Sequence, residues 1–156
     1  MSVSAPFVTQ DRVRWADVDL IGIMRFSAYT RLVEMGEQEL MRAAGIPYRR
    51  AFDAPAIWLP RRHLSIEYFA PVRIDELLDL VTYVSRLGET SATINVDVRV
   101  TDGGNLAAAA AIVVVCVDPT TFAKRALPEE LRLALTPFVC SVPEARAGTA
   151  TPPLLR

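Results

Sequence analysis

Histidine and cysteine are scarce in this chain, and their scarcity excludes several kinds of site. The 156 residues include one histidine and two cysteines, too few for a protein-built zinc site or a disulfide framework. The Gly-x-Ser-x-Gly elbow of serine hydrolases and the glycine-rich loops that bind phosphates are also absent from the sequence. We therefore expect no metal and no bound cofactor.

The chain also lacks an excess of charge and a long apolar run. Its 17 basic and 18 acidic residues leave a net charge of −1, which gives no general attraction to nucleic acid or to an anionic membrane. The longest apolar run, residues 106–117, is too short to span a bilayer as a helix. Residues 1–10 lack the apolar core of a signal peptide. We expect a soluble cytoplasmic protein that binds neither nucleic acid nor membrane.

Hydrophobic residues make up 51% of the chain, which is enough for one domain with a sizeable core. Residues 91–100 alternate cleanly between apolar and polar side chains, as in a strand with one buried face. Glycine-containing turns at 88–89 and 102–105 separate this strand from its neighbours. Similar patterns predict strands over residues 8–15, 57–69, 77–87, 90–101 and 106–118.

One long helix is predicted between the first and second strands. Ser27 is a plausible N-cap, apolar side chains recur at helical spacing from Tyr29 to Ala44, and Gly45 marks the end. Gly36 falls on the apolar stripe, where it lowers the helix propensity. A glycine at that position indicates a close approach of the helix to the sheet.

These elements predict an α+β domain over residues 1–140, in which an antiparallel sheet of about five strands wraps around one long central helix. A short helix is expected over residues 128–135, and a loose tail over residues 141–156. One helix cannot cover both faces of the sheet, and the sheet keeps exposed edges. We therefore expect a homodimer or homotetramer, with His63 at the surface or at an interface.

The most informative segment lies between the first strand and the long helix. It holds Asp17, Asp19 and Gly22, close to the free N–H groups and positive dipole end of the helix. A carboxylate in such a place can attack a carbonyl or activate a water, while backbone N–H groups hold the carbonyl oxygen. Taken alone, the two acids could equally be turn and cap residues.

The acid-x-Asp-x-x-Gly pattern of this segment resembles the active-site segment of the 4-hydroxybenzoyl-CoA thioesterase family, and the resemblance extends over roughly residues 8–138. Members of this family are hotdog-fold enzymes that hydrolyse acyl-CoA thioesters. The resemblance implies that Asp19 acts as nucleophile or general base and that the backbone N–H of Phe26 polarises the thioester carbonyl. It implies a substrate that is an acyl-CoA or an acyl-carrier protein, with coenzyme A as part of the substrate rather than a cofactor. Asp17 would serve the loop by accepting backbone hydrogen bonds.

The helix start departs from that family. Many members have aromatic-His-x-Asn-Tyr where this chain has Arg25, Phe26, Ser27, Ala28 and Tyr29. Tyr29 is kept as a substrate-binding position, but the histidine and asparagine are lost. Arg25 could pair with the catalytic carboxylate, meet a carboxylate or phosphate of the substrate, or be solvated. The departures leave open an alternative function, a non-catalytic hotdog module that binds acyl-CoA as a sensor or partner.

Two further residues bear on the chemistry. Glu34 is the alternative base, because some hotdog thioesterases carry the catalytic acid on the long helix. It could also belong to a charged helix face whose members pair across a turn. Gly22 permits the tight turn and lets the substrate approach the backbone.

The rest of the substrate has weaker candidates. Coenzyme A is anionic at its nucleotide end, which Arg73, Arg86 and Ser91 could meet, although a solvated arginine is the ordinary case. The alanines at 107–111 are unusual in a strand. They either let the helix approach closely or widen a tunnel for an aliphatic acyl chain, near Met24, Phe26 and Trp58.

Overall fold

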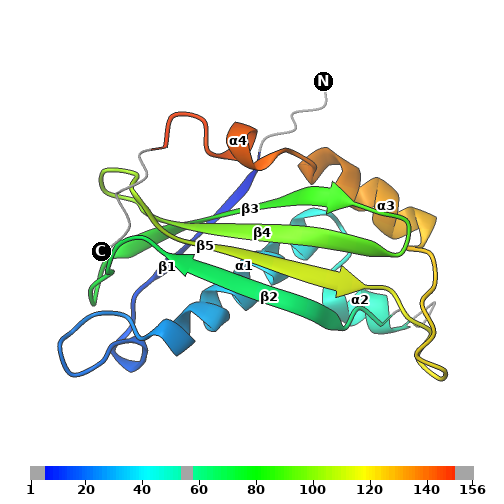
Figure 1. Ribbon diagram of the computed structural model, residues 1–156, viewed down its shortest axis with the longest axis horizontal. Helices are drawn as coiled ribbons and strands as arrows, with labels where there is room; N and C mark the ends of the chain where they lie inside the picture. The colour runs from blue at the N-terminus through cyan, green and yellow to red at the C-terminus, as the bar shows by residue number, and fades with distance from the viewer. Residues whose placement is uncertain (1–5, 54–57, 150–156) are drawn as a thin grey trace.

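The computed structural model describes residues 6–53 and 58–149 and shows one antiparallel sheet with a long helix against it (Figure 1). The strands lie in the order β1-β3-β4-β5-β2. Their bounds are β1 Phe7–Arg12, β2 Arg61–Tyr68, β3 Leu77–Leu87, β4 Ser91–Val100 and β5 Leu106–Val115. The helices are α1 Tyr29–Ala43, α2 Tyr48–Asp53, α3 Glu129–Leu135 and α4 Val142–Ala145. Short 3₁₀ turns cover Trp15–Asp17, Phe26–Ala28 and Thr136–Phe138. The predicted α+β arrangement is confirmed.

Helix α1 packs against the middle of the sheet. A Cβ built on Gly36 would lie 2.7 Å from Thr82 Oγ1 and 3.0 Å from Val96 Cγ1, so the helix backbone approaches β3 and β4 more closely than any side chain would allow. The close approach predicted from Gly36 is therefore confirmed. Leu32 and Leu40, on the same stripe, are fully buried.

Part of the other face of the sheet, over β3 and β4, is covered by the C-terminal segment, which corrects the expected loose tail. Ser141 caps α4, and Ala145 is buried against β3. Arg146 then donates two 2.8 Å hydrogen bonds to the fully buried carboxylate of Asp97 on β4. Residues 142–149 are thus anchored by one buried ion pair that connects partners far apart in the sequence. Residues 150–156 of the expected tail lie outside the described residues.

The end of the first strand and the beginning of helix α1 also differ from expectation. The first strand ends at Arg12; Val13 is buried, but Trp15 is 86% exposed and starts a 3₁₀ turn. Helix α1 begins at Tyr29 with Ala28 in the N-cap position, not Ser27. A 3₁₀ turn at Phe26–Ala28 precedes it, and such turns commonly satisfy part of a helix terminus in place of a side-chain cap.

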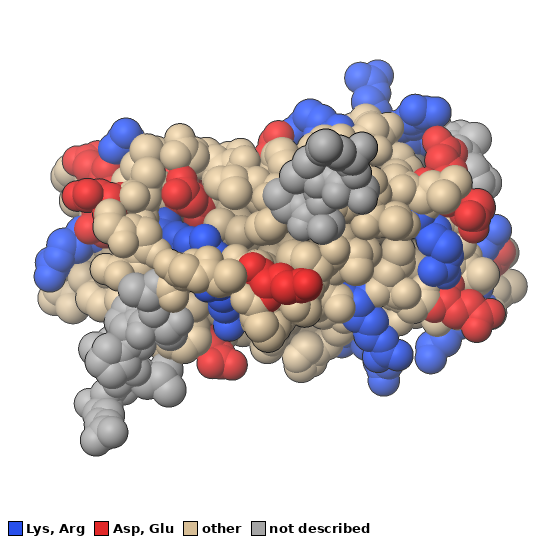
Figure 2. All heavy atoms as spheres, turned by 90° about the horizontal axis from the view of Figure 1, so that it is seen from above, with Lys and Arg blue, Asp and Glu red and all other residues tan. Residues whose placement is uncertain are grey.

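β2 is an edge strand that pairs only with β5. Apart from Ile66, its side chains are exposed, including Leu64 at 45% and Tyr68 at 39%. His63 is also exposed on this strand, as predicted. On the face seen in Figure 2, acidic and basic side chains are interspersed rather than gathered by sign. In the described part of the chain, no helix is long and apolar enough to cross a membrane.

Candidate active site

The loop between β1 and α1 is held in place by Asp17. This side chain is 4% exposed and accepts hydrogen bonds from the Arg14 N–H at 2.9 Å and from Arg31 at 2.5 and 3.1 Å. Burial alone would raise the pKa of Asp17, but the hydrogen bonds from Arg31 and Arg14 lower it below its ordinary value. Asp17 is therefore an ionised anchor for the loop, in the structural role that the sequence predicts.

Asp19 occupies a tight turn two residues later. Its N–H donates to the Ile23 carbonyl at 2.9 Å, and its carbonyl accepts from Gly22 at 3.1 Å. Gly22 has a φ of +80°, a conformation that favours glycine. One carboxylate oxygen of Asp19 accepts from the Ile21 N–H at 2.9 Å, and within the described residues the other accepts no hydrogen bond. The turn thus holds an exposed carboxylate with one oxygen available for chemistry.

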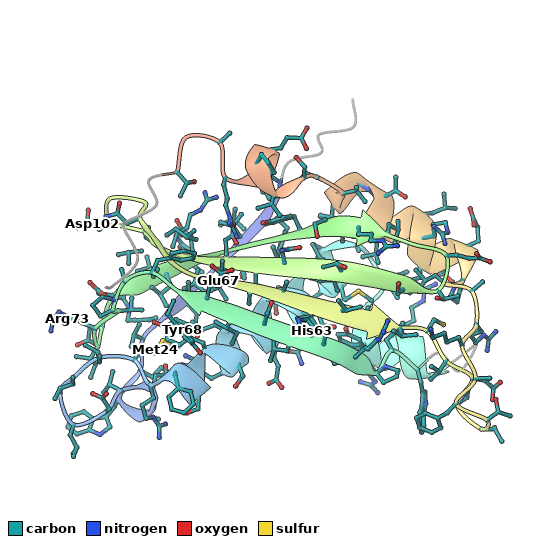
Figure 3. All side chains as sticks on the ribbon, viewed as in Figure 1. Met24, His63, Glu67, Tyr68, Arg73 and Asp102 are labelled. Carbon is teal, nitrogen blue, oxygen red and sulfur yellow. The ribbon has the colours of Figure 1, made fainter. Side chains whose placement is uncertain are left out.

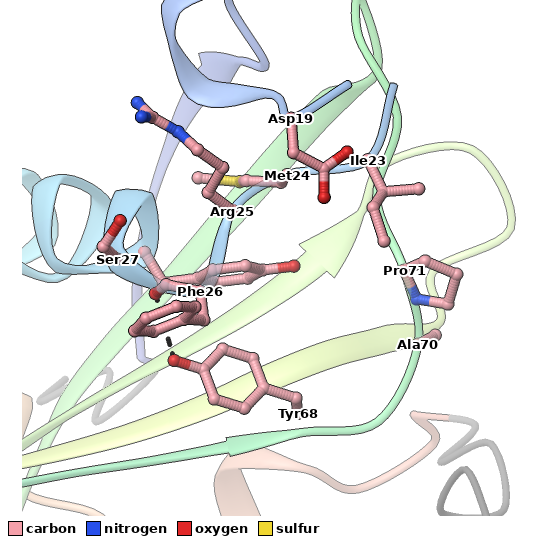
Figure 4. A pocket seen from close by; sticks show the side chains of 10 residues that line it. Asp19, Ile23, Met24, Arg25, Phe26, Ser27, Tyr68, Ala70 and Pro71 are labelled. Atoms are coloured by element: carbon pink, nitrogen blue, oxygen red, sulfur yellow. Dashed lines mark hydrogen bonds between the residues drawn. The ribbon is translucent and has the colours of Figure 1, made fainter. Parts of the chain in front are cut away.

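Asp19 lies at the rim of a pocket of about 450 Å³, a volume typical of small-molecule sites. Figure 4 shows the carboxylate across the pocket from Phe26 and Tyr68. Most of the lining surface is apolar, which suits the hydrocarbon part of an acyl group. The lining residues are Asp19, Ile23, Met24, Arg25, Phe26, Ser27, Tyr29, Tyr68, Ala70 and Pro71.

Phe26 lines this pocket and has a backbone N–H without an acceptor among the described residues. It is the first residue of the 3₁₀ turn that leads into α1, so its N–H has no acceptor within that turn. Among the described residues no backbone acceptor contacts it from elsewhere. Its carbonyl, by contrast, accepts a 3.1 Å hydrogen bond from the Tyr68 hydroxyl, drawn as a dashed line in Figure 4. Tyr68 therefore holds the Phe26 carbonyl, while the Phe26 N–H has no acceptor among the described residues.

Tyr68 is a site residue that the sequence analysis missed. Its place beside Leu64 and Ile66 on the apolar side of the strand suggested only packing. In the structure its ring lies edge-on to Tyr29, with centroids 5.0 Å apart at an interplanar angle of 82°. Strand periodicity could indicate the face on which Tyr68 lies, but not that the start of α1 lies across from it.

Arg25 lines the pocket but is held by the loop. It donates to the Ala16 carbonyl at 2.5 Å, and its N–H donates to the Asp17 carbonyl at 2.8 Å. The ion pairs of the described residues do not include one between Arg25 and Asp19. Arg73 is close by, because its backbone bridges to Ile23. Figure 3 shows Arg73, Met24 and Tyr68 at the same end of the molecule.

The remaining candidates lie elsewhere. Glu34 lines a separate polar cavity with Gln38, Tyr48 and Arg61. Trp58 bridges to Val117 and packs on Phe122, with ring centroids 5.5 Å apart.

Arg86 and Ser91 flank the turn between β3 and β4, at the opposite end of β3 from the Asp19 loop (Figure 1). The alanines at 107–111 pair with β4 and β2, and Ala110 lies opposite Val96, which contacts the helix at Gly36. Within residues 6–53 and 58–149, no group of three or more His, Cys, Asp or Glu side chains could hold a metal ion.

Comparisons with known proteins bear on the family and the fold of this chain. The model of the thioesterase-like superfamily matches residues 13–135. An acyl-CoA thioester hydrolase, YbgC from Escherichia coli O6:H1, is 30% identical over 121 residues, which cover 77% of this chain and 88% of that protein. A 1,4-dihydroxy-2-naphthoyl-CoA hydrolase from Nostoc punctiforme is 24% identical, with 80% and 83% covered.

Among solved structures, Slr0204, a 1,4-dihydroxy-2-naphthoyl-CoA thioesterase from Synechocystis, superimposes with a TM-score of 0.79. The identity is 19%, and the match covers 85% of this chain and 96% of that one. This likeness establishes the hotdog fold that the sequence predicts.

Proposed function

The chain belongs to the thioesterase-like superfamily, and from that premise we propose that the pocket beside Asp19 hydrolyses an acyl-CoA thioester with Asp19 as the catalytic carboxylate. The chain is an acyl-CoA thioesterase, as its 30% identity to an acyl-CoA thioester hydrolase over most of both chains indicates. One observation carries the assignment of the site. Asp19 presents a carboxylate oxygen that accepts no hydrogen bond from residues 6–53 and 58–149, at the rim of a mainly apolar pocket.

The geometry supports a simple reaction. The acyl group enters the apolar pocket, and the thioester carbonyl oxygen accepts a hydrogen bond from the Phe26 N–H, which stabilises the oxyanion as it forms. Asp19 then either attacks the carbonyl carbon or takes a proton from a water that attacks it. The carbon–sulfur bond breaks, and the thiolate of coenzyme A leaves and takes up a proton. Where water is the attacking group, the free acid forms directly; where Asp19 attacks, an acyl–Asp19 anhydride forms first, and a water then hydrolyses it to the free acid and regenerates the carboxylate. Both routes consume one water in total.

Asp19→Asn tests the assignment. We expect thiol release from acyl-CoA esters to fall at least about a hundredfold, which corresponds to ~2.7 kcal/mol of transition-state stabilisation, because an amide neither attacks nor accepts the proton. Glu34→Gln is the matched control, since Glu34 is an exposed acid on α1 that lines a different cavity. Loss of turnover in Glu34→Gln with full turnover in Asp19→Asn would move the chemistry to the helix. Binding of the esters without turnover by the native protein would favour the non-catalytic module.

Coenzyme A is proposed as the thiol of the substrate, rather than a carrier protein, because the curated relatives cited above are CoA-ester hydrolases by name. The cytoplasm is the proposed compartment. Cys116 and Cys140 are both free and buried thiols, and free thiols persist in reducing compartments.

The proposed assembly is a homo-oligomer in which a second copy covers β2. One long side of this strand has no partner within the described sheet, and exposed edges of this kind favour pairing with another chain. Leu64 and Tyr68 add apolar surface beside it. We expect a dimer or larger species by light scattering, and a monomer for Leu64→Lys. Leu133→Lys, at a 63% exposed position on α3, should leave the assembly intact; a native monomer would refute the proposal.

A further inference from the structure

Tyr29 is a buried tyrosine whose hydroxyl has no hydrogen-bond partner among the described residues. Its side chain is 3% exposed and lines the pocket with Asp19, yet its hydroxyl makes no hydrogen bond with any described residue. The enclosed side-chain atoms without a partner are Thr82 Oγ1, Asn95 Oδ1 and Arg99 Nε. The Tyr29 oxygen is not among these enclosed atoms, so solvent reaches it. Solvent reaches it from the pocket, because that is the space that Tyr29 lines.

The Tyr29 ring is held rigidly in this position. It packs edge-on against Tyr68, which is itself fixed by its hydrogen bond to the Phe26 carbonyl. Burial, followed by the neighbouring Tyr68 and Glu76, raises the pKa of Tyr29 to about 12, so the phenol keeps its proton at neutral pH. It is therefore available as a hydrogen-bond donor and not as a general base.

The surroundings of the hydroxyl determine what it would meet. The neighbouring lining comes largely from apolar side chains such as Ile23, Met24 and Pro71. A purely hydrocarbon acyl group would strip water from the hydroxyl and leave it without a partner, which is unfavourable for a buried polar group. An acyl group with one suitably placed oxygen would replace that water.

We propose that the Tyr29 hydroxyl is a specificity-determining donor that selects acyl groups carrying an oxygen acceptor, such as a hydroxyl, an oxo group or a phenol, apart from the thioester itself. This inference rests on the proposed thioesterase function, because it assumes that the acyl group occupies the pocket. It assigns no part of the bond-breaking step to Tyr29. A site built to bond an oxygen discriminates against the analogue that lacks it, since the protein group is then left unpaired.

The test compares Tyr29→Phe with the native protein on pairs of CoA esters that differ by one oxygen. Suitable pairs are octanoyl-CoA with 3-oxooctanoyl-CoA, and benzoyl-CoA with its monohydroxybenzoyl counterparts. We expect the native enzyme to prefer one or more oxygenated members. In Tyr29→Phe, kcat/KM for those members should fall about tenfold, while the values for the unsubstituted esters stay within about twofold. Equal loss on both members of every pair, or no loss, would overturn the proposal.

Tyr68→Phe is the matched control, because it removes the same atom from the other ring of the pair. Its hydroxyl holds Phe26, so its loss should lower kcat for both members of each pair by a similar factor. Thermal denaturation of both variants establishes that they are folded. If the native protein released no thiol from any ester, the affinity for each ester of the same pairs would be measured by calorimetry. The native protein should then bind the oxygenated esters with a lower Kd than the unsubstituted ones, and Tyr29→Phe should lose this difference. The two proposals therefore fail separately.

Discussion

Replacing Gly36 with alanine sets two effects of opposite sign against each other. Alanine is favoured over glycine inside a helix by about 1 kcal/mol, so propensity alone predicts a more stable protein. The new Cβ would lie 2.7 Å from Thr82 Oγ1 and about 3 Å from both methyl groups of Val96. Both neighbours are short β-branched side chains on central strands, with little freedom to move aside. Overpacking of this kind costs roughly 1–3 kcal/mol and more at rigid sites.

We expect the overpacking to dominate, so that Gly36→Ala lowers the free energy of unfolding by up to about 2 kcal/mol after the propensity gain is subtracted. Urea denaturation followed by circular dichroism measures this directly. The Thr82→Ala background provides the control. The Thr82 hydroxyl is buried and has no hydrogen-bond partner in the part of the chain that the structure describes. Its removal takes away the closest contact, so the double variant should recover much of the loss. A gain of about 1 kcal/mol in Gly36→Ala alone would refute the close approach.

Two further predictions concern the buried ion pairs. Burial raises the pKa of Asp17 and of Asp11, but hydrogen bonds from Arg31 and neighbouring groups lower both overall, so their stabilisation is full above about pH 4 and is lost as the pH falls further. We expect Arg31→Gln to lower the free energy of unfolding by about 1–2 kcal/mol at pH 7. Below about pH 4, the urea midpoint of the variant should fall less steeply with pH than that of the native protein. The same pH dependence of the midpoint in both proteins would contradict this. Asp97→Asn leaves Arg146 beside a buried amide. We therefore expect the free energy of unfolding to fall by about 2 kcal/mol and trypsin to cleave faster after Arg146. Unchanged cleavage would mean that other contacts hold the C-terminal segment.

The sequence predicts most of the fold because the relevant signals are local. Alternation identifies β4, and the 3.6-residue stripe with Gly36 and Gly45 identifies α1 and its contact with the sheet. The Asp19 turn was found because its acids and Gly22 are close in sequence and resemble a known segment. Its catalytic role stays a prediction.

The parts that sequence reasoning missed depend on partners far along the chain. Tyr68 contacts Phe26 over a separation of 42 residues, and Arg146 bonds Asp97 over 49. No periodicity links such positions, since each side chain fits its own element equally well without the other. The Ser27 cap failed for a local reason, because a 3₁₀ turn took the place of the side-chain cap.

The residues of the site come from the two edges of the sheet. β1 and β2 are its outermost strands; the segment with Asp19 follows one of them, and Tyr68 ends the other. Edge strands open more readily than central ones. Where no second copy covers β2, a transient opening of this strand would release the Phe26 carbonyl from Tyr68 and interrupt turnover, while the meander of β3, β4 and β5 stays folded. The proposed assembly therefore protects the working geometry, and dissociation of the copies should lower catalysis before heat melts the sheet.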